Sequence, residues 1–194
     1  LRHHSPDGDQ GFPGAVDFTI KIELRKTCLS YHMLAVPERP TPINLAQHSY
    51  YNLMGHGAIW EHQLKIASKG YTPTDETLIP TGELAQFDQA PSGTVPAEVV
   101  PFDFRKVKTI QQADPLKQGS DVNLILTDTG AAPCATLTAP NGLRLKMWTD
   151  QPGLQLYTGA KLSTKAPSMD NQSHQPFSGL CLEPQHFPDS PNQP

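Results

Sequence analysis

The chain has 194 residues, a formal net charge of -4 and no run of basic residues. This length suits one sizeable domain, and the charge gives no electrostatic surface for nucleic acid or an anionic membrane. No stretch approaches the roughly 18 to 20 consecutive apolar residues that a membrane span needs, and the start of the chain lacks the apolar core of a signal peptide. We therefore expect a small neutral ligand, with neither nucleic acid nor membrane as a partner.

Three cysteines occur, Cys28, Cys134 and Cys181, each isolated in the sequence. Their spacing indicates neither a disulfide framework nor a zinc site. They are typical of core thiols in a reducing compartment, so we expect a cytoplasmic protein. The chain begins without Met and stops in the Pro-rich PDSPNQP, so we also expect a fragment cut at both ends, which leaves secretion with a missing leader as the alternative.

The first periodic segment covers residues 15–24, AVDFTIKIEL, in which apolar and polar residues alternate. Alternation of this kind is typical of a half-buried antiparallel strand. The turn pairs Asp7-Gly8 and Pro13-Gly14 precede it, and a second apolar stretch, CLSYHMLAV, follows it. The two apolar stretches together predict a hairpin or a meander.

Further short apolar segments follow, and no window shows a sustained helical period among the 20 prolines and 14 glycines. The strand candidates are PINL, HQLKIAS, VNLILTD, CATLTAP, LRLKMWTD, LQLYTG and GLCLE, with turns such as Asn141-Gly142 and Pro152-Gly153 between them. Residues 69–103 carry little periodicity and predict one long connection, of a kind that is often functional. The pattern predicts a single all-β domain over residues 1–194, either a sandwich or a barrel.

Two residues with acid–base chemistry stand in unusual surroundings. His48 lies in TPINLAQHSYYNL, a polar and aromatic stretch of the composition that lines sugar sites. Glu183 ends the apolar run GLCLE directly before Pro184. Taken alone, a structural histidine and an exposed carboxylate are the simpler interpretations, because a buried carboxylate costs several kcal/mol unless it is paired.

Two further polar residues lie on predicted strands. Asp121 opens the strand in QGSDVNLILTD, where it is either a turn-forming residue or a ligand group. Gln155 lies between Leu154 and Leu156 and should point to the opposite face from both, toward water or a ligand. The histidines at 48, 56 and 62 lack the spacing of a helical metal pair, so we expect no metal site.

Six segments occur in one order along nearly the whole chain: SPDGDQGFPG, TPINLAQHSYYNL, YTPTDETLIPTGE, PFDFRK, TDQPGLQLYTG and GLCLEPQHFPDSPNQP. Together they resemble the aldose 1-epimerases, also called galactose mutarotases. The resemblance implies a large antiparallel β-sandwich of the galactose mutarotase type, with an open sugar cleft on one sheet face. It also implies interconversion of the α and β anomers of free aldohexoses such as galactose and glucose, without metal or cofactor. We expect the protein to be a monomer.

The resemblance assigns two catalytic residues. In the family motif N-H-S-Y-F-N-L the histidine is the general acid, which is His48 here, with Gln47 and Tyr51 in place of the usual Asn and Phe. In the family motif L-E-T-Q the glutamate is the general base, which is Glu183 here, with Pro184 in place of Thr. An acid and a base of this kind would contribute about 10²- to 10⁴-fold each.

The resemblance also assigns two sugar-binding residues. Asp121 matches the aspartate of the family's D-H-N, here D-V-N, and Gln155 matches the glutamine of P-G-x-Q-F-Y-T-G. The family carries another active-site histidine and a substrate-binding arginine upstream of SPDGDQGFPG, and His3 and His4 do not match that motif. We therefore expect the chain to lack the N-terminal third and the closing strands of the family fold.

Three other functions compete with this interpretation. A sugar-binding module or pseudoenzyme would have the same cleft without turnover if the upstream histidine and arginine are truly missing. A β-sandwich glycoside hydrolase or a lyase accessory domain could also use paired carboxylates. A sugar-phosphate epimerase is disfavoured, because no arginine or lysine cluster lies beside His48 or Glu183 in the sequence.

Overall fold

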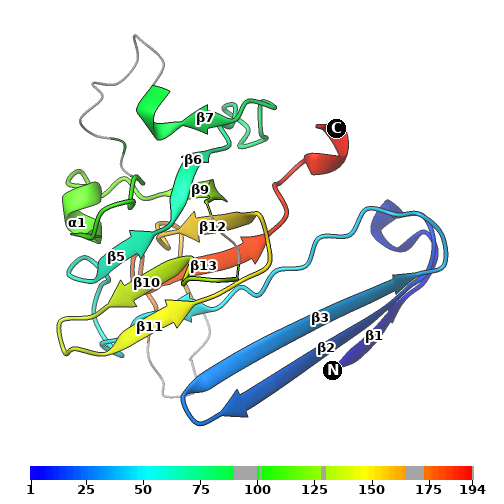
Figure 1. Cartoon of the computed structure of the whole chain (residues 1–194), viewed down its shortest axis with the longest axis horizontal. Helices are drawn as coiled ribbons and strands as arrows, with labels where there is room; N and C mark the ends of the chain where they lie inside the picture. Colours follow the sequence, from blue (N-terminus) through cyan, green and yellow to red (C-terminus); the bar gives the residue numbers. More distant parts are fainter. Residues whose placement is uncertain (90–99, 101, 128–129, 165–172, 194) are drawn as a thin grey trace. The chain divides into compact units, whose positions relative to one another are not determined.

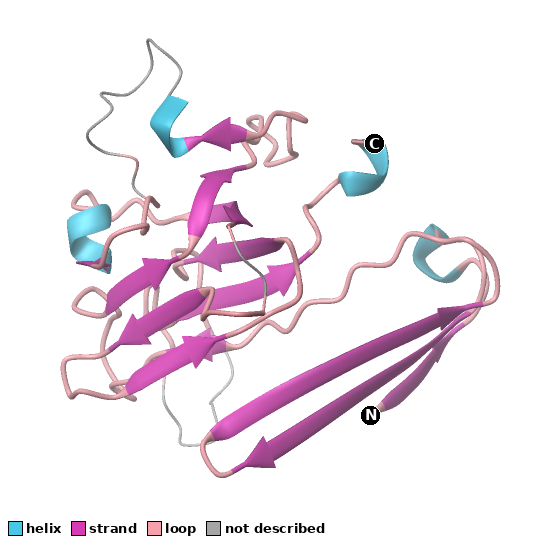
Figure 2. Cartoon of the chain, viewed as in Figure 1, coloured by secondary structure: helices cyan, strands magenta, loops and turns pink. Residues whose placement is uncertain are grey.

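The computed structural model describes residues 1–89, 100, 102–127, 130–164 and 173–193. Within these residues the chain forms three antiparallel sheets, with only short helical turns (Figures 1 and 2). The predicted all-β antiparallel fold is confirmed. The chain divides into two compact units, Leu1–Leu45 and Ala46–Pro194, and a single domain over residues 1–194 stays a prediction.

The first unit is a three-stranded sheet in the order β1-β2-β3. Its strands are β1 (Arg2–Ser5), β2 (Val16–Arg25) and β3 (Cys28–Pro37), and the 3₁₀ turn η1 (Asp9–Gly11) connects the first two. Strands β2 and β3 pair along their full length, which confirms the predicted hairpin. Strand β1 was not predicted, because RHHS has no apolar alternation to mark it.

The second unit holds a four-stranded sheet in the order β11-β10-β5-β8 and a six-stranded sheet in the order β4-β13-β12-β9-β6-β7. The smaller sheet consists of β5 (Gln63–Ile66), β8 (Lys108–Thr109), β10 (Ala135–Thr138) and β11 (Arg144–Met147). The larger sheet consists of β4 (Tyr50–Tyr51), β6 (Ser68–Tyr71), β7 (Ala85–Gln86), β9 (Asp121–Leu126), β12 (Gly153–Tyr157) and β13 (Leu180–Gln185). The short helices are η2 (Phe87–Gln89), α1 (Ile110–Ala113) and η3 (Ser190–Asn192).

One apolar core joins the two sheets of this unit. Leu154 and Leu156 of β12 cluster with Leu64 of β5 and Leu137 of β10, and all four side chains are fully buried. Side chains alternate between the faces of a strand, so the leucines of β12 leave its other residues on the opposite face of the larger sheet. That opposite face is therefore free to carry polar groups.

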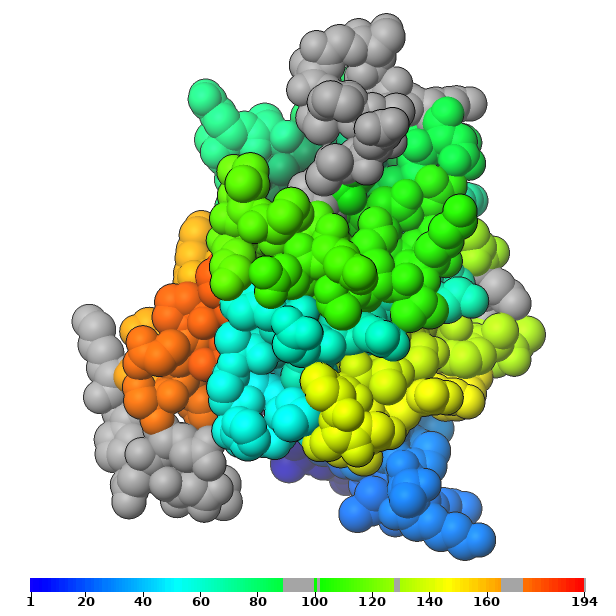
Figure 3. Space-filling view, turned by 90° about the vertical axis from the view of Figure 1, so that its left-hand side faces the viewer, coloured from blue at the N-terminus to red at the C-terminus, as the bar shows by residue number. Residues whose placement is uncertain are grey.

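The segment around α1 closes one side of the core. Thr109 caps α1 in a capping box with Gln112, and the backbone N–H of Gln111 donates to the carbonyl of Trp60, 3.1 Å away. Figure 3 shows this face, where the green residues around α1 lie against the cyan residues that lead to β5. His62 is fully buried here, and its Nε2 accepts a hydrogen bond of 3.1 Å from the Leu53 N–H.

Several predicted elements differ from the structure. PINL forms no strand, and Gly153 begins β12 instead of closing a turn, whereas Gly142 has the positive φ of the predicted turn. The predicted connection 69–103 contains the end of β6 and the short strand β7 of the larger sheet, while residues 90–99 and 101 lie outside the described residues. None of the described helices is long and apolar enough to cross a membrane.

Candidate active site

The polar face of the larger sheet collects the predicted site residues through strand register. Gln155 of β12 lies opposite Glu183 on β13 and opposite Asn123 on β9. One row along, Tyr157 lies opposite Cys181 and opposite Asp121 in the same way. Directly opposite residues share a face, and so do residues two apart on a strand. The side chains of Asp121, Asn123, Gln155 and Glu183 therefore lie on the face that the core leucines leave free.

His48 lies in the segment before β4 and meets Glu183 across this face. The distance from His48 Nε2 to Glu183 Oε1 is 3.5 Å, and 57 % of the His48 side chain is exposed, against 10 % for Glu183. The other ring nitrogen, Nδ1, lies 3.4 Å from Cys181 Sγ, and the ring stacks on Tyr50 with centroids 5.3 Å apart. The imidazole is thus held on two edges and one face, with room for a ligand on the remaining side.

The surroundings of Glu183 make its carboxylate a stronger base than usual. Burial raises the pKa of Glu183, the charge of Asp121 raises this pKa further, and His48 opposes both effects. A base whose pKa is raised toward neutral pH accepts a proton more readily in a general-base step. Glu183 is therefore buried, in contrast to the exposed carboxylate that its sequence alone favours.

Cys181 differs from a nucleophilic cysteine although it lies next to a histidine. It is fully buried, and burial raises the pKa of its thiol to about 12. Reactive cysteines have lowered pKa values and are partly exposed, because the thiolate is the nucleophile. The His48–Cys181 contact is consequently a packing and hydrogen-bonding contact.

Pro184, the substitution next to Glu183, does not turn the carboxylate away from the site. Strand β13 continues through Pro184, which lies opposite Leu154, and Gln185 still pairs with Gly153. Alternation places Pro184 on the face of Leu154, toward the core, and Glu183 on the other face. The missing N–H therefore leaves the register of the strand unchanged.

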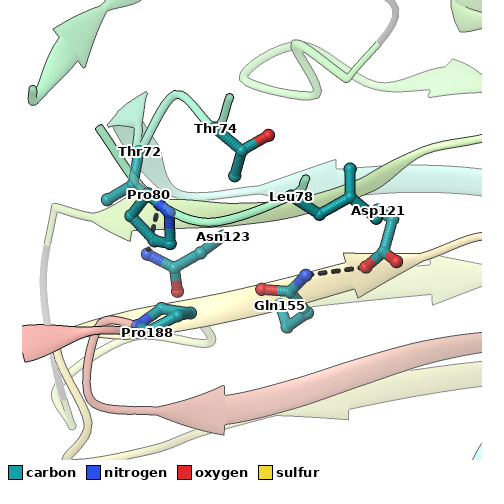
Figure 4. Close-up of a pocket in the computed structure, with 8 residues that line it drawn as sticks. All are labelled: Thr72, Thr74, Leu78, Pro80, Asp121, Asn123, Gln155 and Pro188. Carbon is teal, nitrogen blue, oxygen red and sulfur yellow. Dashed lines mark hydrogen bonds between the residues drawn. The ribbon is translucent and has the colours of Figure 1, made fainter. Parts of the chain in front are cut away.

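Asp121 and Gln155 form the second half of the site. The Gln155 Nε2 group donates a hydrogen bond of 2.7 Å to Asp121 Oδ1. Both line a hollow of about 80 Å³ together with Asn123 and Thr72 (Figure 4). A wider hollow of about 340 Å³ shares Thr72 with the first one and extends toward η3.

Asn123 is a site residue that the sequence reasoning missed. It is buried, it lines the 80 Å³ hollow, and its Nδ2 group donates to Thr72 Oγ1 at 3.4 Å. Its position two residues after Asp121 in one predicted strand was the available signal, because residues two apart share a face.

Three ligand-type atoms, from His48, Cys181 and Glu183, lie within 4.8 Å of one another. Histidine, thiolate and carboxylate groups all bind zinc. His48, however, turns Nδ1 toward Cys181 and Nε2 toward Glu183, and only one ring nitrogen can bind a given ion. The one His48 nitrogen that would bind still lies within 4.8 Å of Cys181 Sγ and of the Glu183 carboxylate, and activity without a metal stays a prediction.

Comparison with known proteins gives a consistent result. The aldose 1-epimerase family model matches residues 1–194. Galactose mutarotase of Mus musculus is 38% identical over 196 residues, covering 98% of this chain and 54% of that protein. Aldose 1-epimerase of Haemophilus influenzae is 34% identical over 201 residues, covering 98% and 56%. The chain spans about half the length of the curated relatives it matches.

Solved structures show the same fold. The GalM/aldose epimerase homologue from C. elegans has a TM-score of 0.85 at 20% identity, covering 98% of this chain and 56% of that chain. Galactose 1-epimerase from Lactobacillus acidophilus has a TM-score of 0.77 at 29% identity, covering 97% and 54%. The predicted fold of the galactose mutarotase type is confirmed.

Proposed function

This chain belongs to the aldose 1-epimerase family, and on that premise we propose that the protein interconverts the α and β anomers of free aldohexoses such as galactose and glucose. The relatives named galactose mutarotase and aldose 1-epimerase support this activity. The polar sheet face supports a neutral ligand rich in hydroxyl groups, because its described residues present carboxylate and amide groups and no cluster of lysine or arginine.

In the proposed reaction Glu183 is the base and His48 is the acid. Glu183 takes the proton of the C1 hydroxyl while protonated His48 gives a proton to the ring oxygen, and the C1–O5 bond breaks to leave an open-chain aldehyde. Rotation about C1–C2 presents the other face of the carbonyl. As the ring closes, His48 takes its proton back from the C5 hydroxyl and Glu183 gives its proton to the C1 oxygen. The protons and electrons balance without a cofactor.

The observation that carries this proposal is the 3.5 Å approach of His48 Nε2 to Glu183 Oε1 on a ligand-accessible sheet face. An acid and a base this close can serve two oxygens that are bonded to the same carbon, as the C1 hydroxyl and O5 are. In the same proposal Asp121 and Gln155 hold sugar hydroxyls, with their own hydrogen bond keeping both groups in place.

Polarimetry on freshly dissolved α-glucose and α-galactose tests the proposal. Glu183→Gln keeps the shape of the side chain but cannot accept the proton, so we expect at least a 10²-fold loss of the catalysed rate, of the order of one acid–base contribution. Glu38→Gln, a change at an exposed residue of the first unit, is the matched control and should keep the original rate. A Glu183→Gln rate equal to that of the unaltered chain would exclude Glu183 as the base.

Three finer assignments belong to the same proposal. We propose galactose and glucose as the ligands, a monomer as the active form and the cytoplasm as the location. Release of reducing ends from a polysaccharide, without any change in the mutarotation rate, would instead favour glycoside cleavage.

A further inference from the structure

Beside the acid–base pair, the site contains a continuous chain of side-chain hydrogen bonds. Gln185 Nε2 donates to Gln155 Oε1 at 3.2 Å and to Asn123 Oδ1 at 3.4 Å. Gln155 Nε2 in turn donates to Asp121 Oδ1 at 2.7 Å, and Asn123 Nδ2 donates to Thr72 Oγ1 at 3.4 Å. Figure 4 shows the Gln155–Asp121 and Asn123–Thr72 bonds at the wall of the hollow.

The donor-to-acceptor direction of these hydrogen bonds follows from the chemistry of Asp121, the last acceptor. An ionised carboxylate only accepts hydrogen bonds, so Gln155 must turn its NH₂ group toward Asp121 and its carbonyl oxygen toward Gln185. Gln185 must then donate, and its single NH₂ group supplies one hydrogen to Gln155 and the other to Asn123. Gln185 is therefore the one member that fixes two neighbouring amides at once.

The hydrogen-bond lengths show which contacts matter most. The Gln155–Asp121 bond at 2.7 Å is short and charge-assisted, and such bonds are about twice as strong as neutral ones. The Gln185–Gln155 bond at 3.2 Å is an ordinary neutral bond, whereas both contacts of Asn123 at 3.4 Å are long and weak. The hydrogen bonds from Gln185 to Gln155 and from Gln155 to Asp121 therefore fix the orientation of the Gln155 amide and the Asp121 carboxylate.

We propose that Gln185 is a positioning residue that holds the Gln155 amide, and through it the Asp121 carboxylate, in the orientation that receives the sugar hydroxyls. This inference rests on the proposed function. Gln185 does not line the 80 Å³ hollow, while Asp121, Asn123 and Gln155 do, so Gln185 lies on the same sheet face beside the hollow and bonds two of its lining residues. Each amide that it holds has one further N–H that is directed to none of these partners.

Two substitutions separate hydrogen bonding from packing. Gln185→Met keeps the length of the side chain and removes the donor, and Gln185→Glu keeps the shape but replaces the donor with an acceptor that faces Gln155 Oε1. A packing role predicts that Glu is tolerated better than Met, and the positioning role predicts the reverse order. Gln151→Met is the matched control, because the Gln151 amide bonds only the neighbouring Asp150 among the described side chains.

The ligand-free experiment uses the side-chain amide signal of Gln155 in ¹H–¹⁵N NMR spectra, assigned by its loss in Gln155→Ala. In the unaltered chain we expect the two Nε2 proton signals to be further apart than those of a solvent-exposed glutamine, because one proton bonds the Asp121 carboxylate. In Gln185→Met their separation should fall to that of a solvent-exposed glutamine amide, with the backbone spectrum retained. Unchanged Gln155 signals in Gln185→Met would overturn the inference whether or not the chain binds sugar.

The sugar experiment measures galactose affinity by NMR titration. Loss of one neutral hydrogen bond should raise the Kd for galactose about fivefold in Gln185→Met, with kcat changed by less than about twofold. In a Gln155→Ala background the same substitution should change the Kd by less than about twofold, because the group that it positions is absent.

The outcomes distinguish the two claims. Equal effects of Gln185→Met with and without Gln155 would overturn the positioning role, even if the chain is an active mutarotase. A chain that binds no galactose but shows the predicted Gln155 signals would support the positioned amide and overturn the proposed function.

Discussion

At the scale of single residues, Glu183 shows a conflict between stability and activity. Its side chain is 10 % exposed, and its pKa is raised chiefly by burial. A pKa raised in the folded protein means that the folded state holds this proton more tightly than the unfolded state does. Its contribution therefore favours folding at low pH and is lost as the pH rises through the folded-state pKa. At neutral pH the ionised carboxylate destabilises the fold that positions it.

We therefore predict that Glu183→Gln raises the free energy of unfolding at pH 7. The gain should be about 1.4 kcal/mol for each unit by which the folded-state pKa exceeds the ordinary value, since that is the energetic equivalent of one unit. The gain should be small near pH 4, where the carboxyl is mostly protonated in both states. Urea unfolding at pH 7 and pH 4 measures this difference in the free energy of unfolding. If Glu183→Gln were less stable than the unaltered chain at pH 7, the stabilisation from the His48 pair would outweigh the cost of burying the carboxylate.

At the scale of elements, a glycine in β12 leaves space for one of the hydrogen-bonded side-chain amides. Gly153 is the first residue of β12, and a Cβ built there would lie 2.6 Å from Asn123 Oδ1 and 3.0 Å from the Phe187 ring. Its φ is not in the left-handed region, so the requirement is for space and not for conformation. The side-chain amide that would be displaced is one of the two that Gln185 holds.

Gly153→Ala should accordingly weaken sugar binding as well as stability. We expect the Kd for galactose to rise about fivefold, in line with one lost neutral hydrogen bond, and the free energy of unfolding to fall by about 1–3 kcal/mol from overpacking. Gly142→Ala is a useful contrast, because nothing lies within 4 Å of a Cβ there and only its positive φ is strained. That variant should lose stability while its galactose affinity is unchanged.

Elements with strong local patterns were predictable from the sequence, and those defined by distant partners were not. The apolar runs of β9, β12 and β13 mark strands, because one face or both faces of each are buried. The alternation of β2 also marks a strand, although Val16 is its only buried residue. Strand β7 has only two residues and exists through pairing with β6, which no local signal encodes. The approach of His48 to Glu183 likewise depends on residues 135 positions apart, so only the family resemblance indicated it.

The hydrogen bonds that link the side-chain amides could not be predicted from the sequence for a related reason. Gln185 and Gln155 each look like polar residues at strand positions, and the directed bond between them depends on the register of β12 against β13. Register follows from which face is buried and from the connections between strands, and these are properties of the assembled sheet. Sequence alone therefore indicated candidate groups, and the fold supplied their arrangement.

At the scale of the whole molecule, the titration of a second buried group, His62, changes the free energy of unfolding in acid in the opposite direction to that of Glu183. His62 is fully buried, and its Nε2 accepts from the Leu53 N–H. Burial lowers the pKa of His62. For a histidine with a lowered pKa, the stabilisation is fully present above the ordinary value of about 6.5 and is lost as the pH falls.

Between about pH 6.5 and pH 5 the stability of the chain should therefore change through these two titrations of opposite sign, because the carboxylates with lowered pKa values, such as Asp103, titrate at lower pH. Below about pH 6.5 His62 should lower the free energy of unfolding by up to about 1.4 kcal/mol per pH unit, while protonation of Glu183 offsets part of this loss. His62→Gln should flatten the slope, and Glu183→Gln should steepen it because the offset is removed. The exposed His56→Gln is the control and should leave the slope unchanged. Urea unfolding measured from pH 7 to pH 4 gives the three slopes, and an unaltered slope in His62→Gln would show that another group governs unfolding in acid.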